Sequence, residues 1–147
     1  MPIASIATAR DEILVLFKAA WDAGPAPVPP LIYTDRPEDV PDSGAWARVM
    51  VQHNLSSQAT LGGKTSLGGG GQRFRRVGLV TVQIFTPSGG GLTQADSLVD
   101  LAVDAFEGES TGSDRVEFRD VRAVEAGHDG PWHQFNVFAE FMYDRVK

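Results

Sequence analysis

The residues with the clearest chemical potential are Gly63, Lys64 and Thr65, which resemble the end of a phosphate-binding loop. That loop needs another glycine five residues before Gly63, and Gln58 stands there instead. It also needs a helix directly after the threonine, whose N-terminus faces the phosphate. Here residues 66–71 consist of Ser, Leu and four glycines, which do not favour a helix. We therefore predict a glycine-rich loop without a nucleotide.

The three histidines, His53, His128 and His133, are the candidate metal ligands. A catalytic metal usually takes three protein ligands on a rigid frame. His128 and His133 flank a predicted turn and are not expected to share a fixed face. His53 lies within a predicted strand, where a hydrogen-bonded core or interface histidine is common. The chain has no cysteine, which excludes thiolate chemistry and disulfides. We predict no metal and no cofactor.

Acyl-transfer chemistry would need a serine in a strained Gly-x-Ser-x-Gly elbow. Ser88 precedes a predicted helix, but its neighbours Pro87 and Gly89 do not match that pattern. We therefore predict no catalytic residue and no enzyme activity. A small hydrolase or ligand-binding α+β domain stays open as an alternative from another class. It would require a closed pocket with polar groups converging beside His133 and Asp129.

The most distinctive polar pattern is a row of carboxylates at Asp96, Asp100 and Asp104 on a predicted helix. Like charges four residues apart cost about 0.2–0.5 kcal/mol per pair in an isolated helix. The row is either a solvated outer face or a surface that meets a basic partner.

Basic residues are concentrated in the middle of the chain. Residues 43–95 contain no acidic residue and five basic ones: Arg48, Lys64, Arg73, Arg75 and Arg76. The whole chain nevertheless carries a net charge of −6, with a pI near 4.9, which disfavours general nucleic-acid binding.

Two helices are predicted by residues repeating at three- and four-residue steps. The first covers residues 3–23, with Ile6, Ile13, Phe17, Ala20 and Trp21 on its apolar face. The second covers residues 92–106, with Thr93 as its N-cap. Its apolar stripe consists of Ala95, Leu98, Val99, Ala102, Val103 and Phe106.

Four strands are predicted over residues 46–55, 73–86, 114–123 and 132–145, and a short one over 31–34. Residues 127–131 are predicted to form the last turn. Residues 56–72 contain six glycines and predict a mobile hairpin tip. In the last strand, Phe135, Val137, Phe141 and Tyr143 share one face, whereas Trp132, Phe138 and Met142 share the other. That strand is therefore expected to be covered by a helix on one side and by a loop or another subunit on the other.

The order of these elements favours one α+β domain spanning residues 1–147. Each strand pair can form without a parallel crossover, so we expect a mostly antiparallel four- to five-stranded sheet with two helices on one face. No run of about 18 apolar residues occurs, so we expect no membrane contact. The N-terminus lacks the pattern of a signal peptide, and the absence of cysteine fits assembly in a reducing cytoplasm.

Three stretches carry a family resemblance: RVGLVTVQIFTP at residues 76–87, GLTQAD at 91–96 leading into LVDLAVDAF at 98–106, and GPWHQFNV at 130–137 with FMYD at 141–144. With the order of elements, they make the chain similar, over roughly residues 30–144, to the tail-terminator proteins of long-tailed phages and phage-derived particles. The resemblance implies a small α/β subunit that forms a six-membered ring. Such a ring caps the tail tube, ends its growth and provides the surface for the head–neck complex.

The resemblance also implies partners and a location. The partners would be copies of the chain itself, the tail tube protein and a head–neck connector, with DNA passing through the ring without sequence-specific contacts. The location would be the top of a virion tail assembled in the cytoplasm of a bacterial host. Another neck or tail-completion protein is the closest alternative. No catalytic residue is implied.

A ring requires two different patches that fit head to tail. We hypothesise that Arg73, Arg75 and Arg76 of one subunit meet Asp96, Asp100 and Asp104 of the next.

Overall fold

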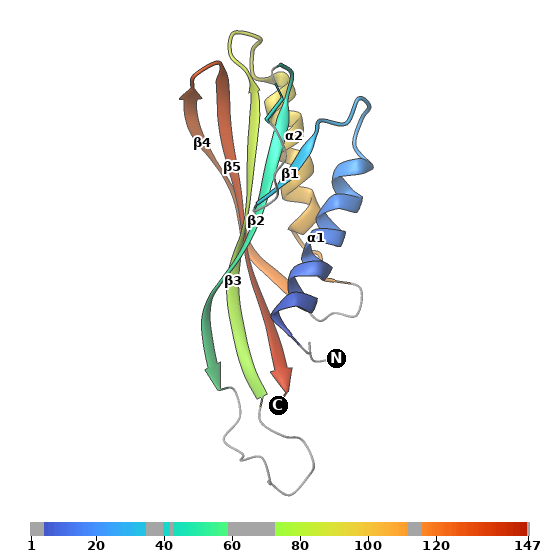
Figure 1. Cartoon of the computed structure of the whole chain (residues 1–147), viewed down its shortest axis with the longest axis vertical. Coiled ribbons are helices and arrows are strands. Elements are labelled where there is room, and N and C mark those ends of the chain that lie inside the picture. The colour runs from blue at the N-terminus through green and yellow to red at the C-terminus, as the bar shows by residue number, and fades with distance from the viewer. Residues whose placement is uncertain (1–4, 35–39, 42, 59–72, 112–115, 147) are drawn as a thin grey trace, which may run out of the picture.

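The computed structural model describes residues 5–34, 40–41, 43–58, 73–111 and 116–146. The elements follow in the order α1 (Ile6–Asp22), β1 (Leu31–Tyr33), β2 (Trp46–Gln58), β3 (Arg73–Pro87), α2 (Thr93–Phe106), β4 (Glu117–Asp129) and β5 (Trp132–Val146). The five strands form one sheet in the order β1-β2-β3-β5-β4. Only β1 and β2 are parallel, and the other neighbours are antiparallel. Both helices lie on one face of the sheet, so the predicted α+β fold is confirmed (Figure 1).

The first helix contacts the core through every fourth residue. Ala9, Ile13, Phe17 and Trp21 are buried, and the ring of Phe17 stacks on Phe106 of α2 with centroids 5.4 Å apart. This contact packs the two helices side by side. Ile6, which the apolar pattern placed on the same face, is exposed, because it is the first helical residue and lies at the end of α1.

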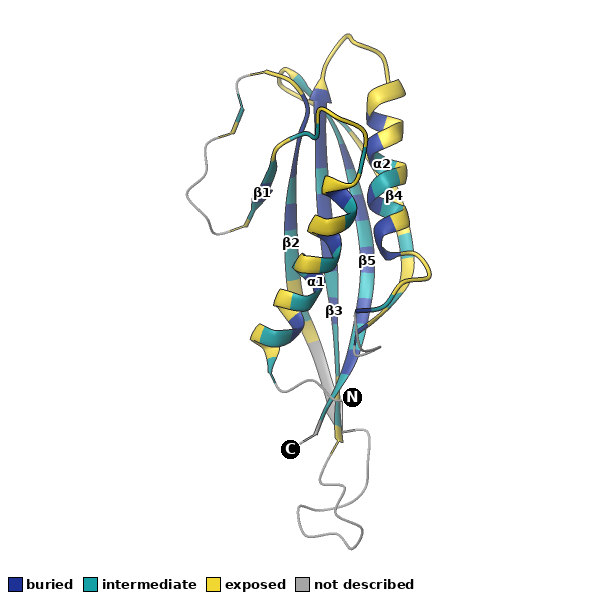
Figure 2. Cartoon of the chain, turned by 90° about the vertical axis from the view of Figure 1, so that its right-hand side faces the viewer, coloured by how far each residue is buried: buried dark blue, intermediate teal, exposed yellow. Residues whose placement is uncertain are grey.

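The core lies between the helices and the two long central strands (Figure 2). The predicted inner face of β5 is confirmed, because Phe135, Val137, Phe141 and Tyr143 are all buried there. Leu98, Ala102 and Phe106 of α2 belong to the same cluster. β3 and β5 pair along their full lengths, from Arg73 opposite Val146 to Pro87 opposite Trp132, and this pairing joins the two halves of the chain into one sheet.

The first long hairpin extends further than predicted. β2 continues to Gln58, which pairs with Phe74, so residues 56–58 belong to the strand and not to the predicted tip. The strand extends because β3 begins at Arg73, so its backbone can hydrogen-bond to β2 as far as residue 58. The rest of that tip, residues 59–72, lies outside the described residues and includes Lys64 and the segment resembling a phosphate-binding loop.

The prediction for the second hairpin was wrong about where β4 ends and the turn begins. β4 covers Glu117–Asp129 and so continues past residue 123, whereas the predicted start at 114–115 lies outside the described residues. Its turn has only two residues, Gly130 and Pro131, with Asp129 pairing directly with Trp132. Gly130 has a φ of 60°, a left-handed conformation that glycine adopts without strain. Residues 127–129 therefore continue the ladder instead of forming the turn.

The N-cap prediction for α2 was also wrong. Leu92 occupies the cap position and makes no side-chain hydrogen bond there, while Thr93 is the first helical residue. The backbone N–H of Asp96 donates to the carbonyl of Leu92 at 2.8 Å. Asp96 lies in the first turn, where a carboxylate interacts favourably with the helix dipole.

Candidate functional site

The three aspartates of α2 form one exposed row. Asp96, Asp100 and Asp104 are all exposed, whereas the opposite side of α2 packs into the core. The helix contains no lysine or arginine, and none of the three carboxylates forms an ion pair within the described part of the chain. The outer face of α2 thus carries an acidic row with uncharged Thr93, Gln94 and Ser97 exposed near its start.

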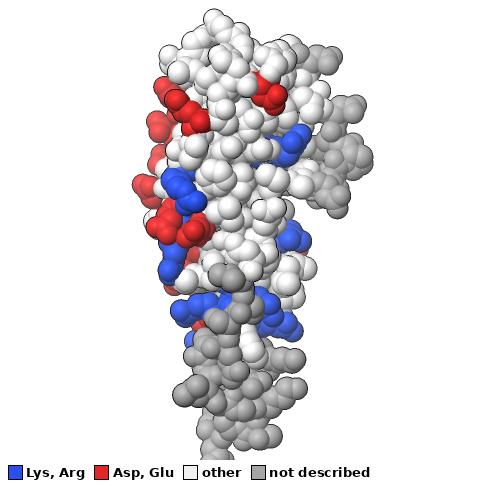
Figure 3. Space-filling model, turned by 90° about the vertical axis from the view of Figure 1, so that its left-hand side faces the viewer, with Lys and Arg blue, Asp and Glu red and all other residues white. Residues whose placement is uncertain are grey.

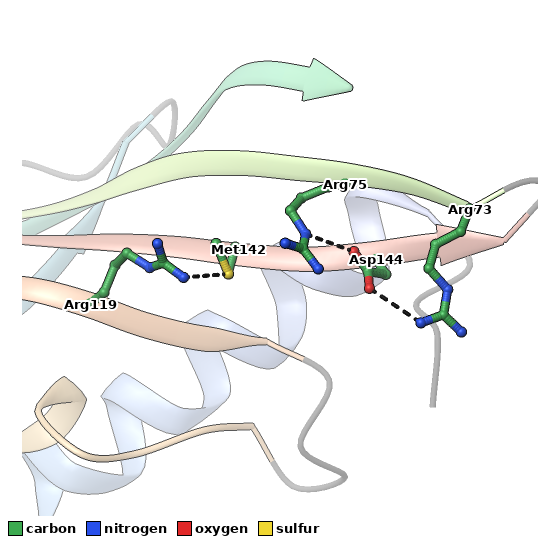
Figure 4. A network of polar contacts seen from close by, with 5 residues as sticks. All are labelled: Arg73, Arg75, Arg119, Met142 and Asp144. Carbon is green, nitrogen blue, oxygen red and sulfur yellow. Dashed lines mark hydrogen bonds and ion pairs between the residues drawn. The ribbon is translucent and has the colours of Figure 1, made fainter. Parts of the chain in front are cut away.

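The three arginines of the hypothesised ring interface do not form one patch. Arg73 and Arg75 lie on the face of the sheet away from the helices and contact Asp144 of β5 (Figure 4). The distances are 3.5 Å from Arg73 Nη1 and 3.2 Å from Arg75 Nε to the carboxylate oxygens. Asp144 thereby raises the pKa of Arg75, through a hydrogen bond and its charge. Asp144 is a partner that sequence reasoning missed.

Arg76 points to the other side of β3. It pairs with Tyr143, whose side chain is in the core, and it is only partly exposed. Successive side chains of a strand alternate between faces, so Arg75 and Arg76 cannot serve the same flat surface. The hypothesised interface therefore combines residues from both faces of the sheet.

The face of the sheet without helices, here called the open face, carries polar, aromatic and methionine side chains side by side. Paired residues on neighbouring strands share a face, so the register identifies them. One rung consists of Arg48, Gln83 and Asn136, and the next of Met50, Thr81 and Phe138. Figure 3 views this side of the molecule and shows a mainly uncharged centre with charged residues towards the margins.

An aromatic cluster lies at one end of the open face. Trp46 and Phe85 stack with ring centroids 4.1 Å apart, and Trp132 meets Trp46 edge-on at 6.1 Å. Ile32 of β1 completes this cluster, which is separate from the main core. In the sequence, Trp46 and Arg48 stand two residues apart and therefore share one face of β2. The rings that contact Trp46 could not be identified in this way, because Phe85 belongs to β3 and Trp132 to β5.

Three arginines of the open face contact aromatic rings or a methionine sulfur instead of carboxylates. The guanidinium of Arg48 lies 5.3 Å from the ring centroid of Trp46, and that of Arg122 lies 5.3 Å from that of Phe138. Arg119 Nη2 is 2.8 Å from the sulfur of Met142 (Figure 4). None of the three forms an ion pair within the described residues. Aromatic rings, methionine and arginine are the residue types enriched at protein–protein interfaces.

On the helix side, His53 has a structural partner. Its Nε2 lies 2.7 Å from the hydroxyl of Tyr143. Burial lowers the pKa of His53, and the charges of Arg10 and Arg76 lower it further. Burial also raises the pKa of Tyr143, against the opposite effect of nearby arginines. Both side chains are therefore uncharged at neutral pH, as expected for a core hydrogen bond.

The prediction that His128 and His133 share no fixed face was wrong. The two-residue turn makes them direct cross-strand partners, with ring centroids 4.9 Å apart. Ser88 Oγ lies 3.1 Å from Nδ1 of His128. A nucleophilic serine would also need a third group that orients the histidine. No carboxylate hydrogen-bonds to His128 among the described residues, and no cluster of three or more His, Cys, Asp or Glu residues occurs there.

A groove of about 470 Å³ lies between α1 and the outer edge of β2. Its lining residues are Arg10, Asp11, Leu14, Tyr33, Thr34, Val49, Met50 and Val51. Neither His133 nor Asp129 contributes to it, so it is not the pocket that the hydrolase alternative requires. Arg10 Nη2 donates to the carbonyl of Val51 at 3.3 Å across this groove.

No helix among the described residues is long and apolar enough to cross a membrane.

The comparisons with known proteins concern the fold. No family model and no curated protein matches the chain. A solved structure of a protein without a functional name is similar, with a TM-score of 0.64 and 18% sequence identity. The similarity covers 91% of this chain and 94% of the other. At this identity, the comparison supports the α+β fold with two helices on a mixed, mostly antiparallel five-stranded sheet.

Proposed function

We propose that this chain is a structural subunit of a phage-type tail that assembles into a ring, capping the tail tube as a tail terminator does. The proposal starts from the resemblance of residues 76–106 and 130–144 to that family. In a virion, its partners are the tail tube protein and the head–neck connector, and its role requires no catalysis. Its location is the top of the tail, after assembly in the host cytoplasm.

The observation that carries the proposal is the open face of the sheet. No helix of the described part lies over it, and it presents half-buried Trp132, Phe138 and Met50 together with three arginines that lack ion pairs within that part, while Trp46 and Phe85 beneath Trp132 are buried. Half-buried aromatic, methionine and arginine side chains on one face are the composition that protein–protein interfaces favour. The acidic face of α2 is a second, different surface. Two unlike patches on one subunit are what a head-to-tail ring requires.

The direct test is the native mass of the purified chain, combined with electron microscopy of the same sample. We expect a closed ring with about six times the 15.8 kDa subunit mass and a central opening. Adding the ring to tail tube protein during polymerisation should then arrest tube growth. A chain that stays monomeric at all concentrations would refute the ring, and a ring that leaves tube growth unchanged would refute the capping role.

A further inference from the structure

We propose that the open face of each subunit is covered by the acidic outer face of α2 from the next copy of the chain. This inference rests on the proposed function, because it assumes that copies associate. It names the two surfaces in contact, and it replaces the contact hypothesised from sequence between Arg73, Arg75 and Arg76 and the aspartates of α2.

The first argument is the chemistry of the open face. Its centre is formed by uncharged, partly exposed side chains, including Met50, Gln83 and Phe138. Arg48 and Arg122 lie at opposite sides of this centre, on β2 and β4, each with its guanidinium over an aromatic ring. Arg122 Nη1 also donates to the backbone carbonyl of Asp120 at 3.1 Å, and the remaining N–H groups of a guanidinium stacked on a ring lie at the edge of its plane, where a carboxylate can bind. The face thus offers cationic positions around an uncharged centre.

The second argument is charge complementarity. The exposed side of α2 carries Asp96, Asp100 and Asp104 and no base. Four acidic residues of the described part also occur on the open face: Asp144 contacts Arg73 and Arg75, Glu140 lies opposite Arg119, and Glu117 and Asp129 lie near the two ends of β4, away from Arg48 and Arg122. Arg48 and Arg122 therefore remain as the cations that a carboxylate row from outside would meet.

The third argument is the match in size. The row from Asp96 to Asp104 spans eight residues, or about 12 Å of helix at 1.5 Å per residue. Arg48 and Arg122 are on strands separated by three strand spacings, or about 14 Å across the sheet. Arg122 also lies two residues further along the ladder than the rung of Arg48, so a helix inclined to the strands brings one end of its acidic row towards each arginine.

The fourth argument is the geometry of the two surfaces. The open face and the outer face of α2 lie on opposite sides of the subunit, one at the sheet layer and one at the helix layer (Figure 1). A contact between them is heterologous, so every subunit uses both surfaces, and the assembly closes into a ring where the rotation between neighbouring copies returns to the first subunit. A second copy also fits better than DNA, because phosphates would meet Glu140 and Asp144 on the same face of a chain with a pI near 4.9.

The test compares assembly of charge-reversed variants by native mass spectrometry across protein concentrations. Arg48→Glu with Arg122→Glu should raise the concentration at which rings half-dissociate by roughly tenfold or more. Asp100→Lys with Asp104→Lys should do the same, and combining all four changes should partly restore assembly. Lys18→Glu is the control charge reversal, because Lys18 is exposed on α1, away from both surfaces, and its ion pair within the described part is with Asp22 of its own helix. It should assemble like the parent.

The outcomes separate this contact from the ring itself. If the parent forms rings and the Arg48→Glu, Arg122→Glu variant forms them equally well, the contact is wrong and the ring stands. If the parent is monomeric, the proposed function fails. Should the reversed variant be poorly folded by circular dichroism, Arg48→Gln with Arg122→Gln replaces it, and unchanged half-dissociation would again overturn the contact. Arginine-dependent binding of a short DNA duplex to intact rings would also overturn it, because the open face would then face the DNA.

Discussion

Gly78 is the position where one added methyl group tests the packing of the sheet most directly. It pairs with His53 on β2 and Phe141 on β5, and the Phe141 ring lies against it. A Cβ atom at this position would lie under 3.0 Å from the carbonyl oxygen of Gln52 and from Cζ of Phe141. A glycine within a strand often marks such a close approach. We expect Gly78→Ala to destabilise the fold strongly.

The magnitude follows from which atoms must move. Inserting a methylene group into a packed core typically costs about 1–3 kcal/mol, occasionally more. Here one obstacle is the backbone of β2, which cannot rotate away, and the other is a fully buried ring. We therefore expect a loss of about 3 kcal/mol. For a domain of this size, each kcal/mol shifts Tm by about 2–4 °C, so Tm should fall by roughly 6–12 °C.

Urea unfolding followed by circular dichroism measures this loss, and several protein concentrations separate folding from assembly. Gly90→Ala is the matched control, because its Cβ would meet only the Pro87 carbonyl at 3.8 Å. It should be neutral or stabilising by up to about 1 kcal/mol. Repeating Gly78→Ala in a Phe141→Leu background removes the ring atoms, and a loss of at least about 1 kcal/mol should remain because of Gln52. A loss below about 1 kcal/mol for Gly78→Ala alone would refute the close approach.

Three further perturbations test other contacts of the fold. Phe141→Ala should cost about 3–5 kcal/mol in urea unfolding, since the side chain is fully buried, and a loss under about 1 kcal/mol would contradict that burial. His53 has a folded pKa below its ordinary value near 6.5, so the unfolded chain binds this proton more readily. The contribution of neutral His53 to the free energy of unfolding should be fully present above about pH 6.5 and be lost as the pH falls below that value. In His53→Gln, the unfolding midpoint should therefore depend less on pH in this range. An unchanged pH dependence would exclude a role for His53. Asp144→Asn removes the partly exposed ion pairs with Arg73 and Arg75 and should cost under about 1 kcal/mol, a loss that shrinks in high salt. A larger loss that salt leaves unchanged would show that the carboxylate does more than pair with them.

The sequence predicted the features that depend on local periodicity. Alternation along residues 132–145 identified Phe135, Val137, Phe141 and Tyr143 as one face, and the structure buries all four. The same rule separates Arg75 from Arg76, so the combined patch could have been rejected from sequence alone. Helical spacing in α2 likewise placed the aspartates on the side away from the core.

Strand ends and turn positions were less predictable. His128 and His133 became cross-strand partners because the turn contracts to Gly130 and Pro131, and β4 then runs through residues 127–129. The segment around residues 127–131, with its two glycines, could form turns of several lengths. The two-residue turn forms because β4 pairs with β5 as far as Asp129 and Trp132, and this pairing depends on the position of β5 in the whole sheet.

What the sequence determined by itself is which side chains share a face of each strand and helix, because that depends only on the period of the backbone. The tertiary structure alone decided which strands are neighbours and in which register. Trp46 thereby meets Phe85 and Trp132, and Asp144 meets Arg75, which is 69 residues away along the chain. Such partners are set by the hydrogen-bonded ladders of β3 with β2 and with β5, where a shift of one residue would move every side chain of a strand to the opposite face.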